Sequence, residues 1–182
     1  MNDNLNNIMK TYLSNDIISL RAIEPEDIEL LYLWENDPEI WEVSHTLVPY
    51  SKYILALYIQ NSDKDIYESK QLRLMITTKE GKTIGAIDLF DFDPYHSRVG
   101  IGLLIHNRED RSKGYASAAL EQIIFYCFNK LRINQLYANI EISNTVSLQL
   151  FEKYGFKICG TKKDWLRTPQ GWGDEVMLQL IC

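Results

Sequence analysis

A short basic turn, Arg111-Ser-Lys-Gly-Tyr-Ala116, contains residue types suited to holding an anion. It follows the apolar, β-branched run 99–105 and precedes apolar residues at helical spacing, which predicts a strand, a turn and a helix in that order. The first N–H groups of a helix lack intrahelical partners and carry the positive end of its dipole, so several can donate to one phosphate. Gly114 leaves room there, and Arg111 and Lys113 add positive charge. The turn is therefore predicted to bind a phosphate.

The spacing of this turn differs from two other phosphate loops. The Gly-x-x-x-x-Gly-Lys-Ser/Thr pattern of a Walker loop and the Gly-x-Gly-x-x-Gly pattern of a dinucleotide-binding turn are both absent. A basic turn with a glycine can also be only a solvated connection between two elements. Between a strand and a helix, however, the pattern Arg-x-x-Gly-x-Ala resembles the pyrophosphate-binding motif of the GNAT family of N-acetyltransferases.

A second stretch, Asn144-Thr-Val-Ser-Leu-Gln-Leu-Phe-Glu-Lys-Tyr-Gly-Phe156, is similar to the other cofactor segment of that family. Ser143 or Asn144 is suited to cap a helix, and Gly155 is suited to end it in a left-handed conformation. Such caps need no ligand by themselves. The two segments nevertheless occur in the family's order, about thirty residues apart and each after a predicted strand. The chain is therefore identified as similar to the GNAT family over residues 17–181.

Composition limits the class of protein. A chain of 182 residues with 46% hydrophobic residues suits one domain with a substantial core. We expect a loose N-terminal arm at residues 1–16 and an acetyltransferase domain at residues 17–182. The formal charge of −6 argues against nucleic acid as a partner.

The sequence also predicts a soluble, cytoplasmic protein without a metal site. It contains no apolar run long enough to span a membrane, and its polar beginning does not resemble a signal peptide. The cysteines Cys127, Cys159 and Cys182 are odd in number and widely spaced, so neither a disulfide framework nor a zinc site is indicated.

Periodicity and turn residues predict the order of the elements. We expect a strand at 17–22, helices at 24–36, 39–43 and 51–62, strands at 71–77, 82–92 and 99–105, a helix from 116, a strand at 136–142, a helix at 144–154, and strands at 156–167 and 175–181. The resemblance implies an α/β (α+β) fold in one GNAT-like domain, with a mixed, mostly antiparallel sheet and flanking helices. Its two central strands, here 99–105 and 136–142, are expected to splay apart.

The resemblance also implies acetyl-CoA as the co-substrate. Its pantetheine arm is expected in the gap between the splayed strands, against backbone groups that also belong to a packed strand. Its pyrophosphate is expected at the turn 111–116, and its arm or adenosine half at the second segment. The implied cofactor-binding residues are Leu103, Leu104, Ile105, Arg111, Ser112, Lys113, Gly114, Tyr115, Ala116, Asn144, Ser147 and Phe151.

Within the family, residues 20–27, 34–38 and 171–174 resemble the branch of spermidine and ribosomal-protein alanine acetyltransferases. This resemblance implies transfer of an acetyl group to a primary amine, with a polyamine such as spermidine as one acceptor. Two alternatives stay open: an acetyltransferase of protein N-termini, and a weakly catalytic sensor that binds acyl-CoA. The expected partner is a small amine or a basic peptide terminus, without nucleic acid or membrane, and a homo-oligomer is left open.

The attacking amine must lose its proton, because an alkylammonium with a pKa near ~10.4 is neutral in only about one molecule in a few thousand at pH 7. Carboxylates are candidates for this task, and aromatic faces and acids suit an ammonium ion. At the position where the family often has a tyrosine that protonates the leaving sulfur, this chain has Phe151. The candidate catalytic residues are Glu42, Glu141 and Tyr154, and the candidate acceptor-binding residues are Trp34, Glu35, Trp41 and Asp88.

Overall fold

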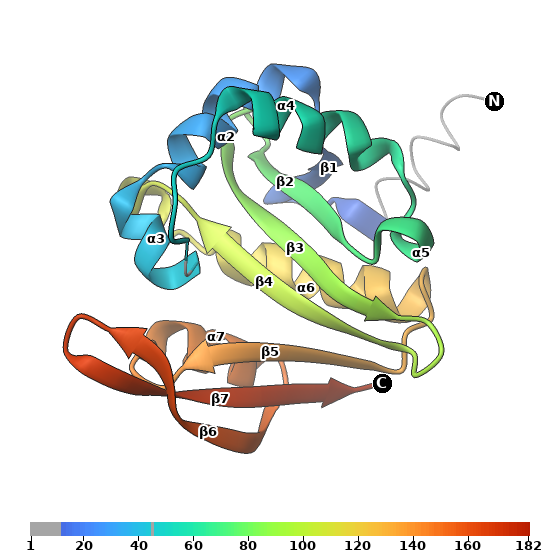
Figure 1. The fold of residues 1–182 in the computed structure, drawn as a ribbon. Helices are drawn as coiled ribbons and strands as arrows, with labels where there is room; N and C mark the ends of the chain where they lie inside the picture. The colour runs from blue at the N-terminus through green and yellow to red at the C-terminus, as the bar shows by residue number, and fades with distance from the viewer. Residues whose placement is uncertain (1–11, 45) are drawn as a thin grey trace.

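The computed structural model describes residues 12–44 and 46–182, without the side chains of residues 42 and 43. Within them, seven strands form one open sheet in the order β1-β2-β3-β4-β5-β7-β6 (Figure 1). Among the described residues, all pairs of adjacent strands are antiparallel except β4 and β5, which are parallel. The strands are β1 (Ile18–Ala22), β2 (Leu72–Thr78), β3 (Thr83–Asp93), β4 (Arg98–Ile105), β5 (Gln135–Glu141), β6 (Lys157–Thr168) and β7 (Gly171–Ile181).

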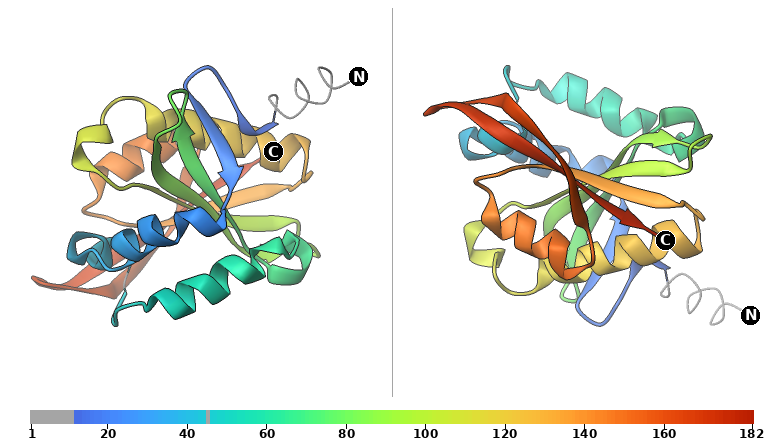
Figure 2. Two further views of the ribbon diagram at one scale, coloured as in Figure 1. Left: turned by 90° about the horizontal axis from the view of Figure 1, so that it is seen from above. Right: turned by 90° about the horizontal axis from the view of Figure 1, so that it is seen from below.

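Helices cover both faces of the sheet, α2 and α4 on one and α6 and α7 on the other (Figure 2). On the first face, Trp34 and Leu55 pack on Met75 of β2. On the second, Leu120 and Ile123 of α6 belong to the larger core. The described helices are α2 (Ile28–Glu35), α3 (Pro38–Ser44), α4 (Lys52–Gln60), α5 (Ile66–Ser69), α6 (Tyr115–Asn129) and α7 (Thr145–Lys153).

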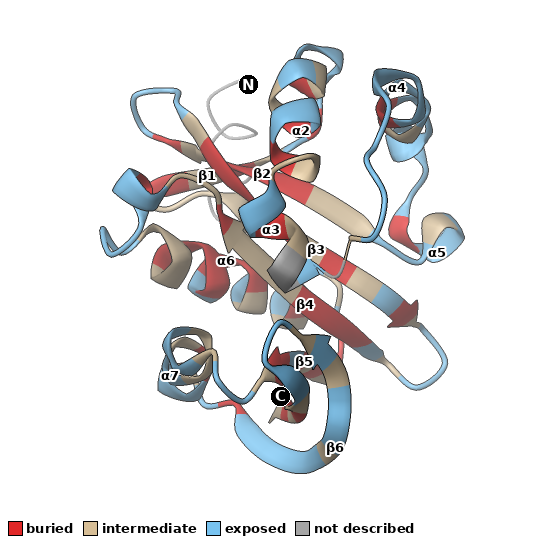
Figure 3. Ribbon diagram, turned by 60° about the vertical axis from the view of Figure 1, so that its left-hand side comes forward, coloured by how far each residue is buried: buried red, intermediate tan, exposed pale blue. Residues whose placement is uncertain are grey.

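The alternation expected for β5 is present and separates the two faces. Leu136, Ala138 and Ile140 are buried in the larger core. The residues between them are less buried because successive side chains of a strand point to opposite faces. In contrast, β6 lies at the edge of the sheet and is exposed along most of its length (Figure 3). The expected α/β domain with a mixed, mostly antiparallel sheet is confirmed.

Four details of the predicted elements were wrong. The helix expected from residue 24 begins with a 3-10 turn at Pro25–Asp27, and α2 starts after it. Pro38 does not only end a helix: it is the first residue of α3, where its missing N–H costs nothing. The short α5 was not expected at all. The last strand begins at Gly171 rather than at residue 175, because only a two-residue turn separates it from β6.

The N-terminal arm predicted for residues 1–16 falls largely outside the described residues. Its last residues, 12–16, contact the domain. Ser14 forms an isolated bridge with Ser19, and the side-chain amide of Asn15 donates to the carbonyl of Ala118 on α6 over 3.1 Å. The ring of Tyr12 stacks on Phe125 at 5.7 Å between ring centres. This part of the arm is therefore packed against the domain.

In the described part of the chain, no helix combines the length and the apolar character needed to cross a membrane. Among the same residues, no three His, Cys, Asp or Glu side chains are grouped so that they could hold a metal ion. The thiols of Cys127, Cys159 and Cys182 are free, and burial raises the pKa of the Cys127 thiol well above its ordinary value.

Candidate active site

The site begins where β4 and β5 separate. The two strands pair only from Arg98 to Gly100 on β4, opposite Gln135 to Tyr137 on β5. Beyond Gly100, β4 continues beside β3 to Ile105, whereas β5 continues beside β7 to Glu141. Figure 1 shows the strands diverging toward the end of the sheet near α3. The expected splay of the central strands is confirmed.

Backbone groups of β4 face this gap. The N–H of His106 donates to Ile84 of β3, and in an antiparallel pair alternate residues bond the same neighbour. The N–H and C=O groups of Leu104 therefore point toward β3, and those of Leu103 and Ile105 point toward the gap. This arrangement leaves polar backbone atoms at positions where an extended, hydrogen-bonding ligand can pair with them.

The turn 111–116 follows β4 after a short 3-10 turn at Arg108–Asp110, which was not predicted, and leads into α6 as predicted. Ser112 and Gly114 both have positive φ, 61° and 85° respectively, and no side chain caps the N-terminus of α6. A Cβ added to Gly114 would have no heavy atom within 4 Å, so the space beside the first helical N–H groups is open. A phosphate fits this position on both steric and electrostatic grounds.

The arginine of the turn has a structural role that the sequence did not reveal. Nε of Arg111 donates to the carbonyl of Ile105 at 3.1 Å, and Nη2 donates to the carbonyl of His106 at 2.8 Å. The side chain thus fixes the turn to the end of β4. It also uses the carbonyl of Ile105, which faces the gap, as its hydrogen-bond acceptor. Nζ of Lys113 lies 3.6 Å from Oδ1 of Asp110 and is about half exposed, so it keeps access to a ligand at the turn.

The second predicted segment forms α7. Oδ1 of Asn144 accepts from the N–H of Ser147 at 3.1 Å, so Asn144 caps the helix as expected. Phe151, expected beside the cofactor, is only 4% exposed, and its ring packs edge-on against Phe156 at 5.0 Å. The structure therefore gives Phe151 a packing role, and a contact with cofactor stays a prediction.

The candidate proton donor Tyr154 is turned toward α6. Its hydroxyl is 2.7 Å from Oγ of Ser117 and 3.5 Å from Oε2 of Glu121. These contacts join the two helices and give Tyr154 a packing role, and a catalytic role for its hydroxyl stays a prediction. Of the other catalytic candidates, Glu141 ends β5 beside the gap and accepts from Oγ of Ser143 at 2.8 Å, whereas the side chain of Glu42 lies outside the described residues.

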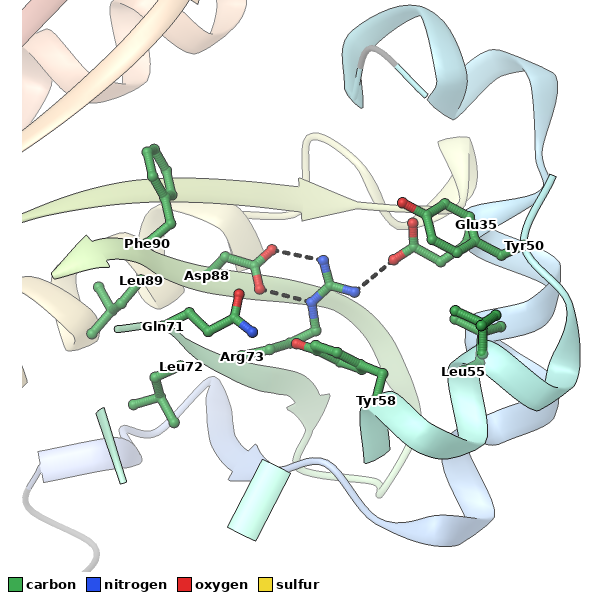
Figure 4. Close-up of a pocket in the computed structure, with 11 residues that line it drawn as sticks. Glu35, Tyr50, Leu55, Tyr58, Gln71, Leu72, Arg73, Asp88, Leu89 and Phe90 are labelled. Carbon is green, nitrogen blue, oxygen red and sulfur yellow. Dashed lines mark hydrogen bonds and ion pairs between the residues drawn. The ribbon is translucent and has the colours of Figure 1, made fainter. Parts of the chain in front are cut away.

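On the α2/α4 face, a cavity of about 350 Å³ brings together two of the predicted acceptor residues, Glu35 and Asp88. A residue that the sequence gave no reason to select, Arg73, joins them (Figure 4). Its Nε and Nη2 donate to the two oxygens of Asp88 at 2.7 and 3.1 Å, and its Nη1 donates to Oε1 of Glu35 at 2.6 Å. The ring of Tyr58 lies 5.6 Å from the guanidinium carbon.

Electrostatics keep the guanidinium of Arg73 charged. Burial alone would lower the pKa of Arg73, but the charge and hydrogen bonds of Asp88, with a contribution from Glu35, raise it above its ordinary value. Burial also raises the pKa of Tyr58, so its phenol stays neutral. The cavity thus holds one fixed cation and two carboxylates, a net charge of −1.

The aromatic residues of the cavity are Tyr50, Tyr58 and Phe90. Trp34 and Trp41 were also expected to bind the acceptor, and the structure places both outside this cavity. Trp34 is 4% exposed in the core under α2 and α4, and Nε1 of Trp41 donates to the backbone carbonyl of Glu35 at 2.6 Å, joining α3 to α2. Neither lines the cavity.

Glycines of β4 make room for one wall of the cavity. A Cβ on Gly100 would overlap the ring of Phe90, and one on Gly102 would touch that ring at 3.8 Å. The ring also packs edge-on against Tyr137 of β5 at 5.8 Å between centres. Phe90 therefore lies across β4 near the point where the strands begin to separate.

Immediately after β4, His106 stacks on Trp34 at 5.3 Å between ring centres, and its Nε2 lies 3.6 Å from Oδ2 of Asp37. Its Nδ1 is buried and forms no hydrogen bond with the described residues. Burial lowers the pKa of His106 more than Asp37 raises it. The imidazole is therefore mainly neutral near pH 7 and packs α2 onto the end of the strand.

A strand-turn-helix junction with room for a phosphate, a gap between two parallel strands and a capped second helix thus follow one another in a single fold. The model of the acetyltransferase (GNAT) domain family matches residues 18–157. The chain belongs to this family. It is an acetyl-CoA-dependent N-acetyltransferase, and the open turn at Gly114 and the polar backbone of the gap suit that co-substrate.

Known relatives are similar over most of their length. The uncharacterized N-acetyltransferase p20 of Bacillus licheniformis is 28% identical over 171 residues, which cover 93% of this chain and 95% of the relative. The spermidine N(1)-acetyltransferase of Escherichia coli K12 is 23% identical over 143 residues, 79% of this chain and 74% of the relative. The structure of spermidine N-acetyltransferase from Vibrio cholerae in complex with CoA and spermine has a TM-score of 0.81 at 20% identity, covering 92% and 96% of the two chains.

Proposed function

We propose that the acceptor is a small aliphatic amine with at least one further cationic group, such as a diamine or a polyamine like spermidine. The observation that carries the proposal is the cavity around Glu35, Arg73 and Asp88, whose net charge of −1 favours a cation. Similarity to spermidine acetyltransferases supports the same class.

In the proposed reaction, bound acetyl-CoA supplies a thioester carbonyl to the amine nitrogen. A C–N bond forms and the C–S bond breaks, so that CoA leaves as the thiolate. The nitrogen of the ammonium form gives up one proton before the attack and a second after it; one proton converts the thiolate to the thiol and the other passes to solvent. The chain contributes mainly by positioning: the turn 111–116 would hold the pyrophosphate, the gap-facing backbone of Leu103 and Ile105 would align the arm, and the cavity would hold the distal cation of the acceptor. Near-attack alignment of two bound substrates is itself a large contribution to rate.

Glu141 is the candidate to receive the proton, directly or through water, because it ends β5 at the open side of the gap. Glu35 lines the cavity, and among the described residues nothing donates to its Oε2, so this oxygen is assigned to the distal cation instead. Because the ammonium form predominates near pH 7, kcat/KM is expected to rise with pH until the free amine is no longer scarce.

An amine panel tests the proposal. Putrescine, spermidine, butylamine, neutral-side-chain amino acids and a basic peptide are each incubated with acetyl-CoA, and product is followed by mass spectrometry and thiol release. We expect kcat/KM for the diamine and polyamine to exceed that for the amino acids by at least about tenfold, because the carboxylates of the cavity attract a distal ammonium. Equal values across the panel would refute the proposal.

A further inference from the structure

We infer that Arg73 sets the charge of the acceptor cavity, so that the cavity takes one ammonium group besides the reacting amine. This inference rests on the proposed function and narrows its substrate class. It concerns how many cationic groups are recognised, and it makes Arg73 a specificity-determining residue.

The position of Arg73 is fixed by three elements. It stands on β2 directly opposite Asp88 of β3, and the fork of its guanidinium matches both oxygens of that carboxylate. Glu35, at the end of α2, binds the remaining side of the fork. The side chains of Arg73, Glu35 and Asp88 are 24%, 19% and 32% exposed, so the cluster is part of the cavity wall and is accessible from it.

The charge count of the cavity is complete for the described lining. Besides these three residues, the described lining contains no acidic or basic side chain other than the phenols of Tyr50 and Tyr58, and burial raises the pKa of Tyr58. Arg73 is covalently part of β2, so an acceptor cannot displace it as it would displace a free ion. One carboxylate is thereby permanently compensated, and one negative charge is left for an acceptor.

Geometry indicates where that charge is available. Both oxygens of Asp88 accept from Arg73, but only Oε1 of Glu35 does. Within the described residues Oε2 of Glu35 has no hydrogen-bond donor, and Tyr50 lines the same cavity (Figure 4). A distal ammonium at this oxygen completes charge neutrality. A third ammonium, as in spermidine, finds no second uncompensated carboxylate.

The test varies the charge in defined steps. Asp88→Asn makes the cavity neutral, Arg73→Met makes it −2, and the double variant Arg73→Met/Asp88→Asn restores −1 without the guanidinium. Three acceptors with one, two and three amines are compared by kcat/KM: butylamine, putrescine and spermidine. Circular dichroism and CoA binding verify that each variant is folded, and the double variant provides a result if Arg73→Met alone does not fold.

For the wild type we expect putrescine to exceed butylamine by about tenfold or more, and spermidine to lie within about threefold of putrescine. Arg73→Met should favour spermidine over putrescine by about tenfold, and Asp88→Asn should abolish the advantage of putrescine over butylamine. The double variant should return to the wild-type order. The inference would be overturned if the ratios of kcat/KM among the three amines stayed constant across the variants. It would also be overturned if the double variant behaved like Arg73→Met.

Failure of the proposed function gives a different result. In that case the wild type binds acetyl-CoA but acetylates none of the three amines. Calorimetry with putrescine alone then decides the inference: weaker binding to Asp88→Asn than to the wild type and the double variant supports it, and equal binding to all three overturns it.

Discussion

Two glycines with nearly the same backbone provide a matched test of the phosphate site. Gly114, before α6, and Gly81, in the turn between β2 and β3, have φ of 85° and 88°. A Cβ on either would have no heavy atom within 4 Å. Because the left-handed conformation costs an L-residue roughly 1–2 kcal/mol wherever it occurs, Gly114→Glu and Gly81→Glu should lose similar stability.

Their effects on CoA binding should differ strongly. A carboxylate at residue 114 would stand beside a pyrophosphate bound at the N-terminus of α6. At a separation of ~5 Å and an effective dielectric constant of ~20, each pair of like unit charges repels by about 3 kcal/mol. This corresponds to acetyl-CoA binding that is weaker by about a hundredfold or more. The same carboxylate at residue 81 would lie beside Lys82, which binds Asp110 before the phosphate turn, and not at the N-terminus of α6. Its repulsion is therefore more strongly screened, and affinity should stay within about tenfold of the wild type.

Calorimetry with CoA and thermal unfolding of the same samples separate affinity from stability. Gly114→Ala and Gly81→Ala complete the series, because they introduce the backbone strain without charge. We expect Gly114→Ala to bind CoA much better than Gly114→Glu. A folded Gly114→Glu protein with wild-type affinity for CoA would show that the pyrophosphate is not bound at this turn.

Three further predictions concern packing and protonation. Phe151→Tyr should raise kcat by up to about a hundredfold if the new hydroxyl reaches the leaving sulfur. Tyr154→Phe should change kcat by less than about tenfold, because the hydroxyl of Tyr154 is hydrogen-bonded to Ser117 of α6. A loss of turnover in Tyr154→Phe with intact CoA binding would contradict this second prediction. Burial holds the pKa of His106 below its ordinary 6.5, so the unfolded chain takes up this proton first, and stability should fall as pH drops from 6.5 through the folded pKa. Thermal unfolding of His106→Phe should lack this pH-dependent loss of stability. The control variant His96→Gln, which changes an exposed histidine, should retain it. Gly100→Ala should lower stability and displace Phe90, measured by unfolding and by KM for the acceptor, and an unchanged protein would exclude the close ring contact.

Local patterns were enough to predict the cofactor side of the fold. Gly114 was predicted to leave room before a helix, and Asn144 was one of two residues predicted to cap the next helix. The structure has the open space at Gly114 and the cap at Asn144. The apolar run of β4 likewise identified a buried central strand. The family resemblance then supplied the relative placement of these elements.

The acceptor side depends on pairs that are far apart in the chain. Arg73 meets Glu35 and Asp88 only after β2, β3 and α2 have assembled, and no spacing in the sequence indicates that contact. Tryptophan gave a misleading signal for a similar reason: Trp34 has the chemistry of a cation-binding face, but the tertiary fold buries it under two helices. Local propensity alone cannot decide between those outcomes.

The brief pairing of β4 with β5 divides the sheet mechanically. Three residue pairs of the described chain join a four-stranded part to a three-stranded part, and beyond them each part continues alone. A ligand with an extended arm in the gap can form hydrogen bonds with both parts and hold them in a fixed relative position. At a concentration a hundred times its Kd, such a ligand stabilises the folded state by about 2.7 kcal/mol. The rigidity of this molecule, and with it its resistance to proteolysis, should therefore follow the supply of its co-substrate.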